Sequence, residues 1–425
     1  MSRRTASVIV SLMVLFAFSF TARISAQAPV APPAEPAGYV PFILKIQITG
    51  KKSPKDFFVP LARRELNRRI RLKKGAGYFI YGKILTPKSI KAGGTGAMLM
   101  RLKITGPGYR MVKQAVIVIV ENLITEDVTS AASLLVSNSP ETINEPGILL
   151  SGTIDRRDGA RYLIHHKNGT GRKLNFMFNL FNAADTPAKV LLLESGLEQS
   201  TQEMTAGHKA ALQFIQNTDS NRGYIIDMPP ASEYVINKNE LDRKITISGM
   251  GEIHVLDGEG VAFAIKASYS NNSDGNGLRE IGQFTSRRGH GFYGAPRVDI
   301  EDRFVIGGRW KFIGIGDKPL ESPYDGHTEL RGNYGVTYRI KVWIVNPTDN
   351  PEKAQLNFAP VSGPAVGTMK VDGELLKIGM QRPPDTFKVK EFLLKPKEER
   401  PVYIEMIPES GSFYPVRLVF MARKI

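Results

Sequence analysis

Beyond residue 140, helical periodicity nearly vanishes from the sequence. Short runs of alternating apolar and polar residues follow one another instead, separated by Gly, Pro, Asn and Asp. Such alternation, with turn residues at close intervals, is typical of antiparallel strands in sandwiches. We therefore predict a mainly β protein with two antiparallel β-sandwich units, at 131–270 and 327–425, preceded by a small basic α+β module at 42–130. The Gly-, Asn- and Arg-rich stretch at 271–326 is predicted to be a long connection or decorated loops, to which Arg303–Ile315 could add strands.

A weak internal repeat supports two units of one architecture. A strand at Leu174–Phe181 leads into a turn at Asn182–Pro187, and a strand at Tyr338–Val345 leads into a turn at Asn346–Pro351. Both turns read Asn-x-x-Asp-x-Pro, in which Asn and Asp bond to local backbone groups and Pro fixes φ before the return strand. The spacing from residue 174 to residue 338 predicts a repeat of 164 residues. Two independent hairpins with the same turn chemistry are the alternative.

The N-terminus is typical of an export signal. Arg3 and Arg4 precede an apolar run from Val8 to Phe20, and small and polar residues follow it up to Ala28. A basic start, a short apolar core and an Ala-x-Ala site define a secretory signal peptide, which we place at 1–28. Five prolines then fall within 29–41, which favours a stiff spacer. We expect a secreted, periplasmic or cell-surface protein with no transmembrane span in the mature chain, because no later stretch is apolar over the required length of about 18 residues.

The sequence contains no cysteine. This excludes a disulfide scaffold, an iron–sulfur or zinc-thiolate site and a cysteine nucleophile. The motif of a P-loop, a serine-hydrolase elbow or a His-Glu-x-x-His helix does not occur. Gly289–Gly294 has a Gly-x-Gly-x-x-Gly string, but it lacks the preceding strand and following helix that a nucleotide phosphate needs. We expect no cofactor and no metal.

The module at 42–130 begins with an alternating strand at Phe42–Thr49, and a helix is predicted after Pro60. One face of this helix carries an apolar stripe of Ala62, Leu66 and Ile70. The opposite face is predicted to carry Arg64, Arg68 and Arg71. Further strands are predicted at Tyr78–Leu85, Ala97–Ile104 and Met111–Glu121.

The positive charge of the protein is concentrated in this module. The chain has 57 Lys+Arg and 41 Asp+Glu, which gives a net charge of +16. Residues 42–130 hold 18 basic and five acidic residues, whereas residues 131–425 hold 36 basic and 35 acidic residues. Three further arginines belong to the predicted signal peptide. The module therefore carries essentially all of the excess charge of the mature chain.

The densest basic cluster lies on and after the helix and surrounds a single acid, Glu65. It comprises Arg63, Arg64, Arg68, Arg69, Arg71, Lys73 and Lys74. Arginine forks bind phosphates and carboxylates through paired hydrogen bonds, and clustered positive charge attracts polyanions. We expect these residues to bind an anionic cell-envelope polymer or a lipid surface, and a solvated basic face without a partner is the alternative. Nucleic acid is disfavoured, because packing explains the alternating Tyr78, Phe79 and Tyr81 more simply than base stacking does.

A second candidate site is a loop within the segment Tyr162–Arg172. It brings together four polar residues, His166, Asn168, Thr170 and Arg172. The Asn168-Gly169 pair also fits a tight turn in which Gly supplies a positive φ. A structural hairpin is the better interpretation, and a small polar binding site is the alternative.

Carboxylates between 250 and 302 are the basis of an enzymatic alternative. They form two clusters, one of Glu252, Asp257 and Glu259 and one of Asp299, Glu301 and Asp302. Asp299 and Glu301 would share a strand face. Glycoside hydrolysis needs two carboxylates about 5–10 Å apart in a cleft. Solvated charges at sheet edges are the simpler interpretation.

Several segments resemble a family of exported bacterial proteins of unassigned function, found in cyanobacteria and some Gram-positive lineages. The resemblance rests on segments at 137–150, on the His166-x-Asn168-Gly-Thr-Gly loop, and on the motif at Arg331–Tyr338 with the turn at Asn346–Pro351. It covers about residues 137–425 and leaves out the basic module. The resemblance implies secretion and a β-rich envelope protein, and it implies no catalytic residue.

These observations favour an exported, non-enzymatic envelope or surface protein that binds or organises anionic polymer through its basic N-terminal module. One alternative is a polysaccharide-acting enzyme with a carboxylate dyad in 250–302. Another is a structural assembly subunit whose exposed sheet edges pair with other chains.

Overall fold

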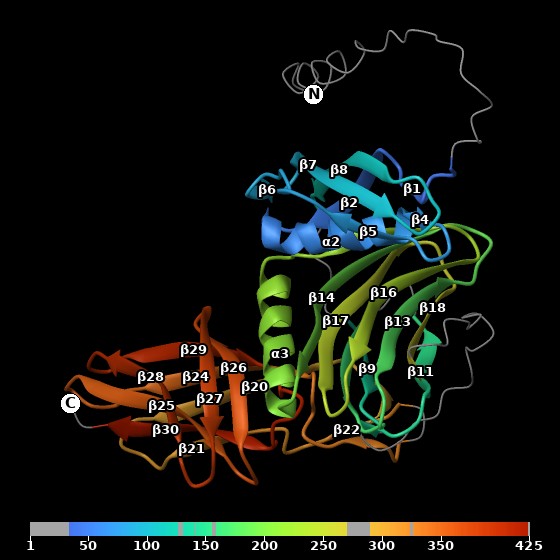
Figure 1. The fold of residues 1–425 in the computed structure, drawn as a ribbon. Coiled ribbons are helices and arrows are strands. Elements are labelled where there is room, and N and C mark those ends of the chain that lie inside the picture. The colour runs from blue at the N-terminus through green and yellow to red at the C-terminus, as the bar shows by residue number, and fades with distance from the viewer. Residues whose placement is uncertain are drawn as a thin grey trace, which may run out of the picture. The chain divides into compact units, whose positions relative to one another are not determined.

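The structure is a computed structural model that describes residues 34–125, 131–139, 141–154, 159–269, 290–323 and 326–423. The predicted signal peptide, 1–28, lies outside the described residues. The described chain is mainly β, as predicted, with helices α2 (Lys55–Arg69) and α3 (Glu203–Asp219) (Figure 1). It divides into two compact units: unit 1 holds residues up to 42, 69–83 and 100–116, and unit 2 holds 43–68, 84–99 and 117–425. The predicted module at 42–130 is therefore shared between the two units.

Unit 1 is built from short paired strands. They are β1 (Gly38–Tyr39), β4 (Arg71–Leu72), β5 (Gly77–Ile80) and the parts of β7 (Thr95–Thr105) and β8 (Val112–Leu123) that fall within it. β1 pairs with β4, and β5 pairs with β7. The described end of the predicted spacer, 29–41, belongs to this unit: Ala37 and Val40 are fully buried, and the Ala37 N–H donates to the Arg110 carbonyl at 2.9 Å. For these residues the spacer prediction is wrong, because two apolar side chains among the prolines are enough to anchor the segment.

Unit 2 begins with β2 (Ile43–Thr49), β3 (Lys52–Pro54), α2 and β6 (Ser89–Lys91). β2 is parallel to β8 and antiparallel to a strand of the first sandwich. The apolar stripe predicted on the helix is confirmed, because Ala62 and Leu66 are fully buried and Ile70, just beyond the end of α2, is 8% exposed. Strands also form where they were predicted at β2, β5, β7 and β8.

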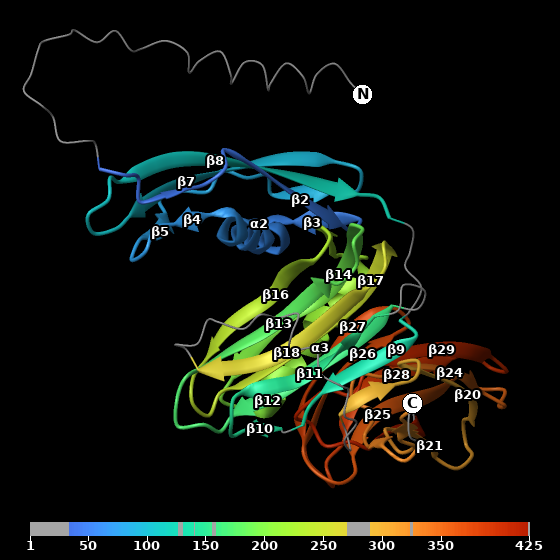
Figure 2. The same cartoon turned by 90° about the vertical axis from the view of Figure 1, so that its right-hand side faces the viewer.

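The first sandwich consists of two facing sheets (Figure 2). One has the strand order β9-β12-β17-β14-β15, and the other has the order β11-β18-β13-β16. The strand bounds are β9 (Ser133–Ser137), β10 (Thr142–Ile143), β11 (Gly147–Thr153), β12 (Ala160–Asn168), β13 (Leu174–Asn182), β14 (Ala188–Ser200), β15 (Tyr224–Met228), β16 (Ser232–Leu241), β17 (Thr246–Asp257) and β18 (Val261–Tyr269). The pairing is antiparallel except where β9 and β10 run parallel to β12.

The second sandwich has the sheets β20-β24-β29-β26-β27 and β21-β30-β25-β28. Its strands, with the short β19 that pairs with β9 and the hairpin β22–β23, are β19 (Gly291–Tyr293), β20 (Arg297–Val305), β21 (Lys311–Ile315), β22 (Leu320–Glu321), β23 (Glu329–Leu330), β24 (Thr337–Val345), β25 (Glu352–Pro360), β26 (Ala365–Val371), β27 (Glu374–Gln381), β28 (Phe387–Leu394), β29 (Glu399–Met406) and β30 (Val416–Arg423). The boundary predicted at residue 327 is wrong, because β20 and β21 lie in the predicted connection and form one edge of each sheet.

The two sandwiches share one topology. Taken in chain order, β9, β11 and β12–β18 occupy the same sheet positions as β20, β21 and β24–β30. The parallel pair at the sheet edge recurs, as β9–β12 and as β20–β24. Even the register shifts agree, because one falls at Phe178/Asn179 and the other at Leu356/Asn357. The prediction of two units with one architecture is confirmed in the described residues.

The predicted repeat spacing of 164 residues is wrong, because it aligns each strand with the neighbour of its true equivalent. It aligns β13 with β24, whereas β12 is the strand that occupies the same sheet position as β24. Asn168 and Asn346 then correspond, and both use their side chains in the same way. Each accepts a hydrogen bond from the N–H two residues on and donates to the carbonyl four residues on. Asn182 makes a similar turn one strand later, which explains the misalignment.

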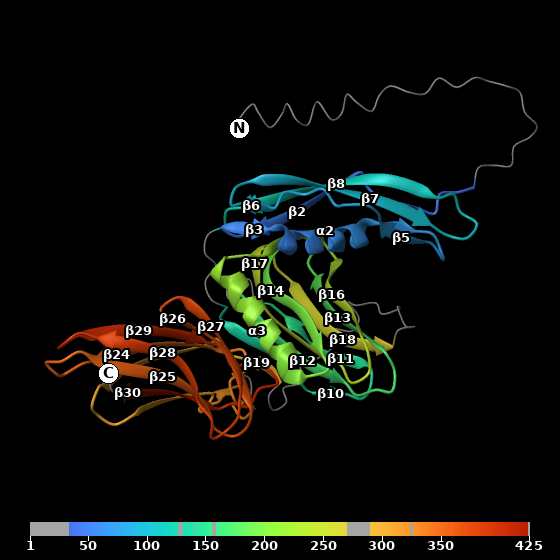
Figure 3. The same ribbon diagram turned by 60° about the vertical axis from the view of Figure 1, so that its left-hand side comes forward.

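Helix α3 is the main difference between the two sandwiches. It is inserted between β14 and β15 and packs against β14 and β17, with β26 on its other side (Figure 3). The equivalent strands β26 and β27 are joined by the tight turn at Asp372 and Gly373, both with positive φ. Neither helix of the described chain combines the length and apolar character that a membrane crossing requires.

Candidate functional site

Two of the predicted polyanion-binding arginines are engaged inside unit 2. The guanidinium of Arg64 lies 3.2 Å from the buried carboxylate of Glu194, which also accepts hydrogen bonds from the hydroxyls of Tyr162 and Tyr224. Arg68 bonds to Glu65 at 2.9 Å and stacks over the ring of Tyr234, 5.0 Å from its centroid. The helix face opposite the apolar stripe therefore packs against the first sandwich. Arg64 and Arg68 therefore already have carboxylate and aromatic partners within unit 2, which makes them less suited to bind a polyanion than the exposed cations.

The remaining cations of the predicted cluster are exposed. Arg63 and Arg69 lie on α2, Arg71 lies in β4, and Lys73 and Lys74 follow β4 directly. Lys73 also pairs with Glu35 at 2.8 Å. The last four all belong to unit 1, because that unit takes up the chain from residue 69.

Unit 1 brings together basic residues that are far apart in the sequence. Its described residues hold nine Lys+Arg and one acid, Glu35. Besides the four just named, the cations are Lys83, Arg101, Lys103, Arg110 and Lys113, of which all but Lys103 are exposed. Sequence reasoning missed these five because they are scattered singly along strands. The signal that identifies them is the absence of any acid from 69–83 and from 100–116.

Large apolar side chains are exposed among these cations. Tyr39 is 61% exposed, Phe42 68% and Phe79 49%, and Leu72 and Met111 are also exposed. The Lys103 ammonium lies 5.6 Å from the centre of the Phe79 ring. Phe79 is therefore an exposed cation–π partner, whereas packing accounts for the half-buried Tyr78 and Tyr81.

The predicted polar loop is a structural turn. The Thr170 N–H donates to the Asn168 side-chain oxygen at 2.9 Å, and the Thr170 hydroxyl lies 2.8 Å from both that oxygen and the Arg172 carbonyl. His166 is fully buried and contacts the Ser137 hydroxyl at 2.8 Å. These contacts occupy His166, Asn168 and Thr170 within the fold, whereas Arg172 is exposed and its guanidinium stacks 5.3 Å from the centre of the Tyr269 ring.

Glu252 is the most buried carboxylate of the predicted acidic clusters. It pairs with Arg161 at 2.7 Å and contacts His254 at 3.2 Å. Burial opposes its ionisation, but the Arg161 guanidinium and His254 outweigh this and lower the pKa of Glu252 to about 2. A general acid needs a raised pKa. Glu252 therefore lacks the property that the enzymatic alternative requires.

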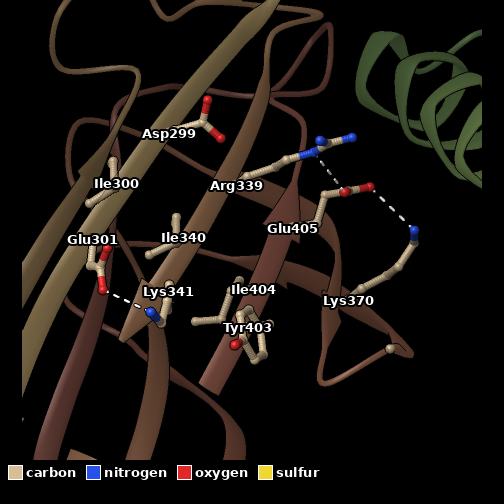
Figure 4. A pocket seen from close by; sticks show the side chains of 11 residues that line it. Asp299, Ile300, Glu301, Arg339, Ile340, Lys341, Lys370, Tyr403, Ile404 and Glu405 are labelled. Atoms are coloured by element: carbon tan, nitrogen blue, oxygen red, sulfur yellow. Dashed lines mark hydrogen bonds and ion pairs between the residues drawn. The ribbon is translucent and has the colours of Figure 1, made fainter. Parts of the chain in front are cut away.

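Two members of the second acidic cluster, Asp299 and Glu301, line an open groove of about 590 Å³ on the outer face of the β20-β24-β29-β26 sheet. Asp299 and Glu301 share this face, as predicted (Figure 4). Both are ion-paired: Asp299 with Arg297 at 2.7 Å and Glu301 with Lys341 at 2.9 Å. The bond from Lys341 lowers the pKa of the Glu301 carboxyl. Glu301 thus acts as an ionised hydrogen-bond acceptor.

The described residues contain no cluster of three or more His, Asp or Glu side chains arranged to hold a metal ion.

No family model and no curated protein matches the sequence. Among solved structures, Lac15 from a marine microbial metagenome is 12% identical, covers 86% of this chain and 84% of that chain, and has a TM-score of 0.13. The CBM22-1-CBM22-2 tandem domain of Xyn10C from Paenibacillus barcinonensis is 9% identical over 82% and 86% of the two chains, with a TM-score of 0.14. SGBP-B of a Bacteroides ovatus mixed-linkage glucan utilization locus is 8% identical over 95% and 98%, with a TM-score of 0.09. Scores this low carry no argument about function.

Proposed function

We propose that this protein is an exported, non-enzymatic envelope protein that binds anionic polymer through the basic surface of unit 1. The observation that carries the proposal is the ratio of nine cations to one acid in the described residues of unit 1. The signal-like sequence at 1–28 supports export.

The chemistry of this surface fits a repeating phosphate or carboxylate polymer. Its cations are spread over β4, β7, β8 and the segments beside them rather than gathered in one pocket. A surface of this kind attracts a chain of charges over about a Debye length, ~8 Å at physiological salt, without requiring one bound pose. Arg69, Arg71, Arg101 and Arg110 supply guanidinium groups, which bind each anionic group with two hydrogen bonds.

A lipid surface is the second candidate partner. It is favoured by the exposed apolar side chains among the cations, including Tyr39, Phe42 and Phe79. Aromatic rings insert at the headgroup boundary while Lys and Arg contact anionic lipid heads.

Binding of the chain from residue 29 to lipoteichoic acid and to polygalacturonate tests the proposal. The unit 1 variant is Arg71→Gln, Lys73→Gln, Lys74→Gln, and the control variant removes three exposed charges from the sandwiches: Lys238→Gln, Arg243→Gln, Lys388→Gln. We expect the unit 1 variant to bind at least one polymer about tenfold more weakly at low salt, and the control variant to bind like the original protein. Equal affinities for all three proteins would contradict the proposal. Binding to anionic vesicles but to neither polymer would contradict the polymer as the partner and would identify a lipid surface as the partner instead.

A further inference from the structure

The shared topology of the two sandwiches identifies one sheet face that is covered in the first and open in the second. In the first sandwich, α3 packs on the outer face of β14 and β17. In the second, a tight turn replaces the helix between β26 and β27. Helix α3 meets this face at β26, where Lys370 pairs with Asp219, and the part of the face over β20, β24 and β29 carries the groove of about 590 Å³. This volume lies within the usual range of about 300–1,000 Å³ for ligand sites.

Equivalent residues on the two faces differ in kind. On the covered face, Leu163 of β12 pairs in register with Met250 of β17, and both are buried in one apolar core with Phe214 of α3. On the open face, the equivalent register pair is Lys341 of β24 and Tyr403 of β29. The change from two buried apolar side chains to a lysine and a 56% exposed tyrosine suits this face to contact with water and a polar ligand.

One polar pair is retained between the faces. Arg161 and Glu252 face each other across β12 and β17, and Arg339 and Glu405 do so across β24 and β29. The first pair is buried, whereas in the second the side chain of Arg339 is 46% exposed. The open groove therefore displays at its surface a charge pair that the first sandwich encloses.

The groove is electrically balanced and its charged groups are held in place. It is lined by three cations and three acids, among which the pairs are Glu301–Lys341 at 2.9 Å, Arg339–Glu405 at 3.4 Å and Lys370–Glu405 at 3.2 Å (Figure 4). Two lining groups also pair with residues outside the groove, Asp299 with Arg297 and Lys370 with Asp219. Trp343, beside the groove, donates its indole N–H to Glu301 at 3.0 Å. Paired side chains lose little additional freedom when a ligand binds, which favours affinity.

These features together indicate the class of ligand. The exposed ring of Tyr403 is a flat apolar platform, and the charge pairs around it offer both donors and acceptors at strand spacing. A pyranose ring has an apolar C–H face and a rim of hydroxyls that need both kinds of partner. Three carboxylates disfavour a polyanion, and a protein partner would favour an apolar centre free of charge pairs. We infer that the groove binds a neutral oligosaccharide, with one sugar ring stacked on Tyr403. This site is independent of the basic surface of unit 1.

The two tryptophans of the chain, Trp310 and Trp343, make a direct test possible. Trp310→Phe leaves Trp343 as the only indole, and its contact with Glu301 makes its emission a reporter of the groove. The full chain with this change is titrated with cellohexaose, xylohexaose and chitohexaose, up to about 5 mM of each. We expect at least one to give a saturable change in emission. Absence of saturation with all three would overturn the inference.

Substitutions at Tyr403 locate the binding. Tyr403→Ala should weaken it about tenfold or more, which corresponds to about 1.4 kcal/mol, and Tyr403→Phe should retain it because the ring remains. Phe413→Ala, at an aromatic that is 51% exposed outside the groove, is the matched control and should bind like the parent. Binding that survives Tyr403→Ala would contradict the assigned site. The unit 1 variant should bind the same hexasaccharide unchanged, so failure of this inference and failure of the polyanion proposal are distinguishable.

Discussion

His165 is a buried imidazole, 2% exposed, and neither of its ring nitrogens has a hydrogen-bond partner among the described residues. Burial is the main cause that lowers its pKa from 6.5 to about 4, against a smaller opposing effect of the Glu203 charge. The folded protein therefore holds this histidine neutral at a pH where the unfolded chain binds a proton. This difference makes the free energy of unfolding depend on pH. The free energy of unfolding decreases as the pH falls below the pKa of histidine in the unfolded chain, and it levels off once the pH is below the pKa of His165 in the folded protein.

His165→Leu should remove this part of the acid sensitivity. The shift corresponds to about 3 kcal/mol between about pH 6.5 and pH 4, and leucine has no proton to bind. Urea unfolding at about pH 7 and about pH 4.5 measures the loss in each protein. We expect the loss to be smaller in the variant by about 2 kcal/mol. The same loss in both proteins would show that His165 does not resist protonation in the fold.

Arg64 and Arg63 are neighbours on α2 with different environments. Arg64→Gln leaves the Glu194 carboxylate buried without its cation, and it should lower the free energy of unfolding by about 2 kcal/mol. This loss is small for a buried ion pair because about a quarter of the Arg64 side chain is exposed. Arg63→Gln is the matched control, and should change it by less than about 0.5 kcal/mol because Arg63 is exposed. Urea unfolding measures both. If Arg64→Gln weakened polymer binding without changing stability, Arg64 would be a polyanion-binding residue and the structural role assigned to it would be wrong.

At the scale of elements, helix α3 decides which sheet face is covered. Its contact with the second sandwich is close at Gly207, where an added Cβ would lie 1.9 Å from the Ser410 carbonyl oxygen. Beside it, His208 contacts the buried Glu409 at 2.7 Å, and this bond raises the pKa of His208. Because glycine usually weakens a helix, Gly207 is explained by this approach rather than by helix propensity.

Gly207→Ala should therefore destabilise the protein, although alanine is the better helix former. We expect a loss of about 2 kcal/mol, typical of overpacking against backbone that cannot move aside. Gly379→Ala in β27 is the control, because nothing lies within 4 Å of its added Cβ. Thermal unfolding of both variants checks the prediction. A Gly207→Ala variant as stable as the parent would mean that α3 does not pack closely against the second sandwich.

The sequence predicted the strands better than their partners. Alternation located β2 and β24, because one buried face leaves a period of two. It did not reveal that β20 and β21 complete the second sandwich, since Gly-rich neighbours obscured them. The repeat was misaligned because Asn168 and Asn182 end successive strands with the same side-chain turn, and local turn chemistry carries no information about sheet position.

At the scale of the whole molecule, the excess positive charge lies in segments that only the fold brings together. The described part of unit 1 is formed from 34–42, 69–83 and 100–116, and each segment after the first contains cations and no acid. Composition located the charge to 42–130, but it did not separate Arg64 and Arg68, which are paired within unit 2, from Lys83 and Arg101. Helical periodicity correctly placed both arginines opposite the apolar stripe. It carried no information about what would pack on that side.

The dependence of polymer affinity on salt tests the central claim most directly. Each phosphate contact made by a cation contributes about one unit to the slope of log K against log salt concentration. The slope for lipoteichoic acid is measured between about 50 mM and about 200 mM NaCl for the parent, the unit 1 variant and the control variant. The account predicts that the slope falls by about two to three in the unit 1 variant and stays unchanged in the control variant. An unchanged slope in the unit 1 variant, or an equal fall in both variants, would contradict it.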